Sequence, residues 1–358
     1  MRILDQYIAR NILNQFGMVL GVLVGLFVFM EFINELSDID RGSYGIFQIV
    51  QYVILRIPKI LYEIFPIASL IGAILGLSGM AKDSELIVMR SVGVSIKRII
   101  LSTIKVGGLL AIASIILGEL LAPMAETKAL RIKAESVQNN VKQKSGYGLW
   151  MRDEKSFVNI IEVLPDLTLL GIKVFEFDKE NQLRHLSSAK LGRFDNKQKK
   201  WILEDINRTI IDFESATSDK LKAALWETEV NPNILKVFLI QPDQLSIWQL
   251  VKYIDHLKEN KQETKEYRLS FWIKVFSPLS IFVMLMLAVP FVFKQVRSGA
   301  LGRGLFSGIM MGLGFFIISK LFNYIVLLPE TNIPPMIGAI IPTLIVFFVS
   351  LFLIRRVT

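Results

Sequence analysis

The stretch IFPIASLIGAILGLSGM, residues 64–80, contains no charged side chain and decides the class of this protein. A helix needs roughly 20 mainly apolar residues to cross about 30 Å of hydrocarbon, where no water satisfies open backbone groups. An amphipathic approach at 52–63 brings this stretch to that length. Working outward from it, spans are predicted at residues 12–33, 64–80, 99–121, 271–293, 305–328 and 333–354.

The composition supports a membrane class. The chain has 358 residues, of which 52% are hydrophobic, and its mean hydropathy is +0.48. These values lie above those of ordinary soluble domains. Cysteine is absent, which excludes disulfides, a thiol nucleophile and a thiolate metal site.

Lysine and arginine collect in the segments on one side of the predicted spans. This bias marks the cytoplasmic side of short loops. The cations concerned are Arg2, Arg10, Lys82, Arg90, Lys97, Arg98, Lys294, Arg297, Arg303, Arg355 and Arg356. The opposite loops hold Arg41 beside Asp38 and Asp40, and then Glu330. Both termini are therefore predicted to be cytoplasmic.

The polar segment between the third and fourth spans is predicted to be an outer β domain. Short β-branched and aromatic runs alternate there with turn signals. Strands are predicted at 156–163, 167–177, 200–203, 209–213 and 234–240, with helical connectors at 126–137 and 245–257. A β-sandwich or jelly roll suits this spacing. The chain then divides into spans one to three at 1–124, the β domain with its connectors at 125–269, and spans four to six at 270–358.

The cytoplasmic segment 82–95 is predicted to form a short capped helix. Asp83 or Ser84 can accept bonds from first-turn amides, and Gly93 can end the helix. Its apolar face is either an interfacial helix on lipid or a coupling helix that docks into a groove of an ATPase. The coupling residues predicted here are Glu85, Leu86, Met89, Arg90 and Gly93.

Two spans carry glycines four residues apart, which places the glycines on one helical face. Such a face either packs against another helix of the same chain or forms a seam with a partner membrane protein. The glycines concerned are Gly17, Gly21, Gly25, Gly304, Gly308 and Gly312.

No stretch matches the phosphate-binding loop Gly-x-x-x-x-Gly-Lys-Ser/Thr, so nucleotide hydrolysis is not predicted on this chain. His185 and His256 lie far apart without a zinc-type spacing, and no enzyme site is expected. Ionisable residues at membrane depth are expensive, and most of them here lie near span ends, where they can snorkel. Lys320, with Asn323, is the deepest of them.

With these features the chain resembles the LptF/LptG family of lipopolysaccharide export permeases. Segment 84–93 is similar to the family's coupling helix, 118–123 to its exit from span three, and 148–150 with 159–160 to the start of its outer domain. Segments 42–44 and 333–339 are more similar to the LptG branch than to LptF. The coupling segment is the most specific of these matches.

The resemblance implies an inner-membrane permease that forms a heterodimer with an LptF-type permease. It implies an LptB-type ATPase dimer that holds ATP and Mg²⁺, with no cofactor on this chain, and an LptC-type periplasmic bridge protein. Lipopolysaccharide would be extracted from the outer leaflet of the inner membrane into a cavity. It would then pass through outer jelly-roll domains to the periplasmic bridge.

Acyl chains need an apolar chamber, and lipid phosphates need cations at its outer rim. The predicted chamber residues are Phe27, Phe29, Met30, Phe65 and Phe316, and the predicted phosphate contacts are Arg41, Lys128, Arg131 and Lys133. The resemblance implies lysines at the outer end of the first span in some members of the family, where this chain has Glu31 and Ser37-Asp38. Recognition is therefore expected to shift to Arg41 and the 128–133 cluster, or to the partner chain.

Two other classes remain open. A non-transporting scaffold or mechanotransmission subunit would link an ATPase to a periplasmic partner, and would pack helices one, two and five shut. A membrane-embedded lipid-modifying enzyme is disfavoured, because no convergent acid, base or metal set is found.

Overall fold

The computed structural model describes residues 3–39, 43–137, 141–143, 148–153, 156–164, 167–178, 180, 182–195, 200–211, 215–226, 228, 232–235, 241–259, 262–295 and 301–357. Within these residues, six helices are long and apolar enough to span a membrane. The helices are α1 (Ile3–Leu36), α2 (Ile46–Lys82), α4 (Ile96–Ile116), α8 (Lys265–Gln295), α9 (Leu301–Leu327) and α10 (Pro335–Val357). The prediction of six spanning helices is confirmed.

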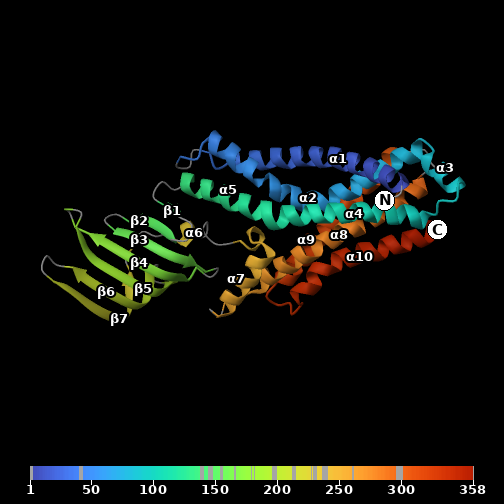
Figure 1. Ribbon diagram of the computed structural model, residues 1–358. Helices are drawn as coiled ribbons and strands as arrows, with labels where there is room; N and C mark the ends of the chain where they lie inside the picture. Colours follow the sequence, from blue (N-terminus) through green and yellow to red (C-terminus); the bar gives the residue numbers. More distant parts are fainter. Residues whose placement is uncertain are drawn as a thin grey trace. The chain divides into compact units, whose positions relative to one another are not determined.

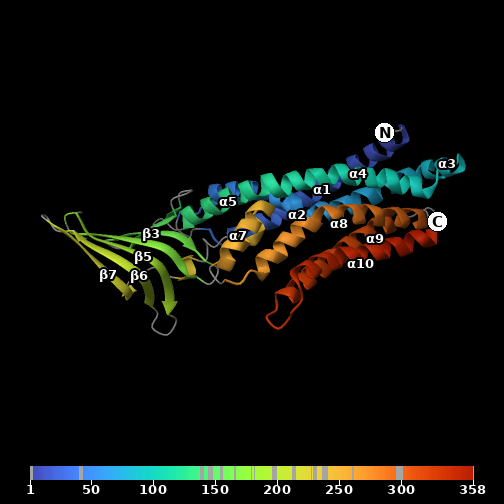
Figure 2. The same ribbon diagram turned by 60° about the horizontal axis from the view of Figure 1, so that its bottom comes forward.

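The main part of each spanning helix belongs to one compact unit, formed by Met1–Ile33, Val53–Thr127 and Pro242–Thr358. Within it α10 packs on α8 and α9, and α4 packs on α8. The start of α1, the end of α10 and the short helix α3 (Glu85–Ser91) lie at one end of the bundle (Figures 1 and 2). A chain with an even number of spans must have both of its ends on the same side.

Close packing of α2 against α1 depends on two glycines of α2. A Cβ atom on Gly72 would lie 2.5 Å from the Cα atom of Phe16, and one on Gly76 would lie 3.0 Å from that of Ile12. The side of α1 that meets α2 is buried, as Ile8 and Ile12 are. The absence of two side chains on α2 therefore lets the two backbones touch.

The third span continues as one long helix through a π-helical turn. The turn η1 (Leu117–Leu121) joins α4 to α5 (Ala122–Val137). A π turn inserts an extra residue into a helix and is frequent at functional sites. Helix α7 (Ile247–Glu259) follows the 3-10 turn η3 (Pro242–Gln244) and precedes α8.

The second compact unit, Asn34–Tyr52 with Lys128–Gln241, contains the β domain. Its described strands are β1 (Val141–Gln143), β2 (Leu149–Asp153), β3 (Ser156–Val163), β4 (Leu169–Phe177), β5 (Leu183–Asp195), β6 (Lys200–Ile211) and β7 (Ala216–Trp226). They form one antiparallel sheet in the order β1 to β7, and the sheet is visibly twisted in Figure 1. The prediction of a helical membrane protein with a β domain in the middle of the chain is confirmed.

The connections of the sheet differ from those of a jelly roll with two Greek keys. Each described strand pairs with its neighbour in sequence, which makes a meander. Val158 pairs with Val174 and Ile172 with Ala189, and these residues form the buried face. Trp201 is buried in the same core. One apolar face along successive hairpins is therefore enough to order the strands.

Strands β3 and β4 were predicted, and the other described strands were divided or missed. Residues 200–203 and 209–213 are predicted as two strands, but Lys200–Ile211 is one strand. Strands β1, β2, β5 and β7 were not predicted; β1 and β2 are short, β5 is mostly half-buried and β7 is exposed along most of its length. The prediction of a strand at 234–240 was wrong at its start, where Pro232–Leu235 is the helix α6. Residues 236–240 lie outside the described part of the chain.

Candidate functional site

The short helix α3 is held to the rest of its chain through its first two residues. Leu86 is 1% exposed and packs in the apolar core of the bundle. The hydroxyl of Tyr7 donates a hydrogen bond of 2.7 Å to Glu85 Oε1. Two of the predicted coupling residues, Glu85 and Leu86, therefore anchor α3 to the bundle.

The two ends of α3 are built differently from each other. Ser84 has a φ of +61° and makes no side-chain bond to the first turn, so the predicted N-cap role of Ser84 was wrong. At the other end the N–H of Gly93 donates to Arg90 O, and the N–H of Val94 donates to Met89 O, both at 3.0 Å. This is a Schellman motif with Gly93 at a φ of +91°. The predicted end at Gly93 is confirmed.

The outward face of α3 is apolar. Ile87 is 51% exposed and Val88 58% exposed, while Met89 is partly buried against the core. The Arg90 guanidinium is exposed and lies over the ring of Phe293, 6.0 Å from its centroid. The sequence did not predict that Ile87 and Val88 form the exposed side of α3, because only the fold shows that Leu86 faces the helical bundle.

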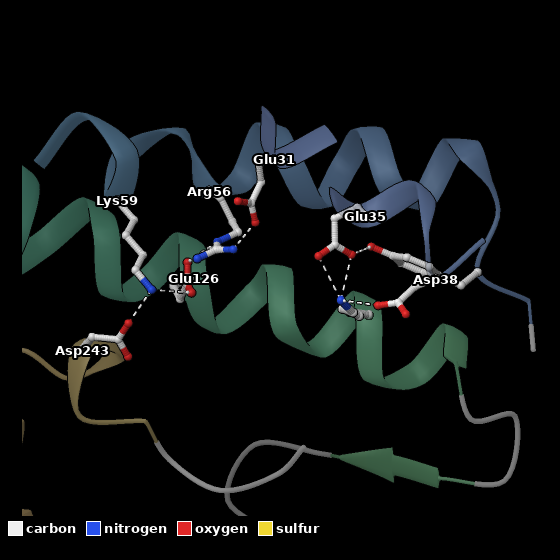
Figure 3. Close-up of polar contacts among 9 residues, drawn as sticks. Glu31, Glu35, Asp38, Arg56, Lys59, Glu126 and Asp243 are labelled. Atoms are coloured by element: carbon white, nitrogen blue, oxygen red, sulfur yellow. Dashed lines mark hydrogen bonds and ion pairs between the residues drawn. The ribbon is translucent and has the colours of Figure 1, made fainter. Parts of the chain in front are cut away.

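A chain of ion pairs crosses four elements of the helical unit (Figure 3). Arg56 lies between two carboxylates, pairing with Glu31 of α1 and with Glu126 Oε2 of α5 at 3.3 Å. Lys59 Nζ lies 3.1 Å from Glu126 Oε1 and 2.5 Å from Asp243 Oδ2 of η3. Glu126 is buried, so removing either cation would leave a buried carboxylate short of a partner. The acidic side chain of Glu31 is therefore matched by Arg56.

A second cluster, in the unit that contains the β domain, surrounds Lys133 (Figure 3). Its ammonium lies 2.8 Å from Glu35 Oε2 and 2.9 Å from Asp38 Oδ2. The hydroxyl of Tyr44 donates to Glu35 Oε2 at 2.9 Å. Lys133 also lies over the ring of Tyr52, 5.3 Å from its centroid. A lipid phosphate would have to compete with two carboxylates for this cation.

The other predicted phosphate contacts lie on α5 or outside the described residues. Lys128 is exposed and Arg131 is half-buried on α5. Arg41 lies outside the described residues. Phosphate binding by these cations stays a prediction.

Four of the five predicted chamber residues are exposed on their helices, and one is not. Phe27, Phe29 and Met30 of α1 and Phe316 of α9 are each at least 40% exposed. Phe65 is 3% exposed and packs edge-on against Phe16, with ring centroids 5.0 Å apart. Phe65 therefore belongs to the α1–α2 contact, while the other four side chains are available to a ligand or partner.

The two glycine faces have different neighbours. Cβ atoms added to Gly17, Gly21 and Gly25 of α1 would meet nothing within 4 Å. A Cβ on Gly308 would lie 2.7 Å from Ile74 Cδ1, and one on Gly312 would lie 3.0 Å from Ile67 Cγ2. The surroundings of Gly304 lie outside the described part of the structure. The α9 glycines thus pack on α2 of the same chain, and the α1 glycines are open.

The π turn η1 supplies a further polar junction that the sequence did not predict. Lys274 of α8 is buried, donates to the Gly118 carbonyl at 3.1 Å and lies 3.8 Å from Glu119 Oε1. Glu119 Oε2 accepts the N–H of Ile247 at the start of α7, at 2.6 Å. The junction ties η1, α7 and α8 together. Across the described ranges no group of three His, Cys, Asp or Glu side chains is arranged to hold a metal.

Comparisons with known proteins place the chain in one family. The model of the family "Lipopolysaccharide export system permease LptF/LptG" matches residues 6–356. The chain is 33% identical to the lipopolysaccharide export system permease protein LptG of Escherichia coli K12, over 99% of this chain and 98% of that protein. It is 32% identical to the LptG protein of Haemophilus influenzae, again over 99% of this chain and 98% of the relative.

Proposed function

Because the chain belongs to the LptF/LptG family of lipopolysaccharide export permeases, we propose that it extracts lipopolysaccharide from the outer leaflet of the inner membrane. In this proposal the lipid passes to a periplasmic bridge protein, and ATP hydrolysis on a separate subunit drives the transfer. The chain is an inner-membrane protein of six spanning helices. Its termini and α3 face the cytoplasm, and its β domain is periplasmic.

The observation that carries the proposal is the small share of α1 and α9 that is buried by the rest of the described chain. In the apolar windows of both helices, 11% of the residues are buried inside the chain, against 67% for α2. These two helices also present Phe27, Phe29, Met30 and Phe316. A substrate with several acyl chains needs apolar helix faces that its carrier leaves free.

The same exposed surfaces support the partners in this proposal. The open α1 glycines suit a seam with an LptF-type permease, since a bare backbone lets a second helix approach closely. The exposed Ile87 and Val88 edge of α3 suits a groove on an LptB-type ATPase dimer, which would bind ATP and Mg²⁺. An LptC-type protein would receive the lipid at the β domain.

A photocrosslinking scan in cells tests this proposal. A photoreactive residue at Phe27 or Phe316 is expected to give lipopolysaccharide adducts, and one at Phe65 is the matched control, because that ring is buried between α1 and α2. Adducts in the β domain should require an active ATPase. Protein-only adducts at Phe27 and Phe316 would instead support the non-transporting scaffold.

The Lys133 cluster provides a separate test of phosphate recognition. Glu35→Gln removes one of the two carboxylates at the ammonium and should strengthen lipopolysaccharide crosslinking near Lys133. Lys133→Met should weaken it, with the exposed Lys128→Met as a comparison. If both Glu35→Gln and Lys133→Met weaken crosslinking equally, the cluster acts only as a structural clamp.

A further inference from the structure

A cavity of about 340 Å³ lies within the helical unit, among α2, α8, α9 and α10. One part of its lining is apolar, including Ile67, Phe276 and Phe316. The other part is polar, with Glu63, Ser277, Ser319, Lys320 and Asn323 among its members. This volume is at the lower end of the range for small-molecule pockets, roughly 300–1,000 Å³. It suits one small headgroup and is too small for a saccharide with several acyl chains.

Two of the three lysines that line the cavity are already neutralised. Lys59 is held by Glu126 and Asp243, and Lys274 is held by Glu119 and the Gly118 carbonyl. Such pairing is what ionised groups at membrane depth require. Neither cation is available without breaking an existing contact.

Lys320 differs from these two lysines. Its ammonium lies over the Phe316 ring, 5.5 Å from the centroid, and no carboxylate of the described residues lies within 4.0 Å of it. Glu63 is the corresponding acid, since no lysine or arginine in the described ranges lies within 4.0 Å of its carboxylate. The cavity therefore contains one cation and one anion that lack a direct partner of opposite charge among these residues.

The cavity is reached from the apolar surface of α9. Phe316 both lines the cavity and is 40% exposed, and Leu313 and Ile317 beside it are exposed as well. Lys320 lies about 10 Å along the axis from the end of α9 at Leu327, at 1.5 Å per residue. That end of α9 leads into α10 and lies away from α3 (Figure 2), so Lys320 belongs to the half of α9 that is farther from α3. A lipid can place its headgroup at this depth and its acyl chains along α9.

We propose that the cavity binds the headgroup of one zwitterionic, amine-bearing phospholipid, with its phosphate on Lys320 and Asn323 and its ammonium on Glu63. A headgroup with net negative charge would meet repulsion from Glu63, and one without phosphate would leave Lys320 unpaired. A primary ammonium donates hydrogen bonds to a carboxylate, whereas a quaternary ammonium has no N–H. This lipid is a resident of the permease and is distinct from the exported cargo.

The test measures lipid binding to the full chain purified with its partner permease, without nucleotide or lipopolysaccharide. Dioleoyl phosphatidylethanolamine, phosphatidylcholine and phosphatidylglycerol are titrated separately, and one-lipid adducts are counted by native mass spectrometry. The expected order is phosphatidylethanolamine first. Lys320→Met should weaken its binding about tenfold or more, because a charge-assisted hydrogen bond is lost. Glu63→Gln should remove the preference over phosphatidylcholine.

Controls separate this site from general lipid attraction. Lys190→Met removes an exposed cation of the β domain, so it should leave all three affinities unchanged. Thermal unfolding of each variant verifies the fold. Equal phosphatidylethanolamine binding by wild type and Lys320→Met overturns the proposal, as does tighter binding of phosphatidylglycerol than of phosphatidylethanolamine by the wild type. Neither result depends on whether export occurs, so the proposed transport function is judged separately.

Discussion

The glycines of α1 and those of α9 have the same spacing and opposite surroundings. Gly308 and Gly312 lie against isoleucine side chains of α2, whereas Gly17, Gly21 and Gly25 meet nothing within 4 Å. Identical spacing therefore predicts that a helix can be approached closely, and does not say by which helix. An exposed glycine face is the more informative of the two, because it marks a helix surface that does not pack against the described part of the same chain.

The largest effect is expected where an added side chain would meet backbone. Gly72→Val places atoms 2.5 Å from the Phe16 Cα atom, which cannot rotate away, so α1 and α2 must separate. Overpacking of this kind costs about 3 kcal/mol. Denaturant unfolding in detergent measures it. Gly79→Val on the same helix has open space and is the control. Equal stability of the two variants would contradict the close α1–α2 contact.

A smaller effect is expected on α9, where the neighbour is a side-chain end. Gly308→Ala meets Ile74 Cδ1 at 2.7 Å, and that methyl group can move to another rotamer. We expect a loss of about 1 kcal/mol relative to Gly314→Ala, which has nothing within 4 Å. Both variants are compared by the same unfolding measurement. A loss as large as that of Gly72→Val would mean that α9 cannot adjust.

On α1 the same kind of change should leave the chain's own stability almost unaltered. Gly21→Leu has open space around it, so the free energy of unfolding should change by no more than about 0.5 kcal/mol. Copurification of the partner permease should nevertheless fall, because the bulky side chain keeps a second helix away. Normal copurification would show that the α1 glycines are not the seam.

The smallest effect belongs to a turn in the β domain, remote in sequence from the glycines. The carboxylate of Asp178 accepts the backbone N–H groups of Gln182 and Glu180 at 2.9 Å each, and the Arg184 side chain at 2.8 Å. These contacts, the Gln182 N–H first, lower the pKa of Asp178. A lowered pKa stabilises the folded turn at every pH above the pKa of the unfolded chain, which is about 4. This stability is lost as the pH falls through the pKa of the folded state.

Hydrogen exchange of the turn between about pH 3 and 6, corrected for its intrinsic rate, measures this effect. Protection should fall with acid in the wild type and vary less in Asp178→Asn. The helix-unit variants should leave the turn's profile unchanged. A wild-type profile as flat as that of the variant would remove the role of Asp178.

Sequence reasoning found features that are repeated along the chain and missed those that join distant segments. A spanning helix can be recognised from about 20 consecutive residues, and all six were predicted. Gly72 and Gly76 were overlooked beside the longer glycine series, although they have the same spacing. The Arg56–Glu31 and Lys133–Glu35 pairs were not predicted, since each joins residues far apart in sequence. An acid and a base on neighbouring apolar helices were the available signal for them.

The π turn at Leu117–Leu121 also sets the helical phase of everything that follows it. Each residue turns a helix by about 100°, so one residue more or fewer redirects the faces beyond by that angle. Because the turn already contains an inserted residue, a one-residue deletion there would restore ordinary α-helical spacing without breaking the span. Glu126, whose carboxylate holds Arg56 and Lys59, would then keep its direction toward both, because the wide turn already absorbs the extra residue. In evolutionary terms this turn is where the chain can change its length by one residue while the ionic partners beyond it stay in place.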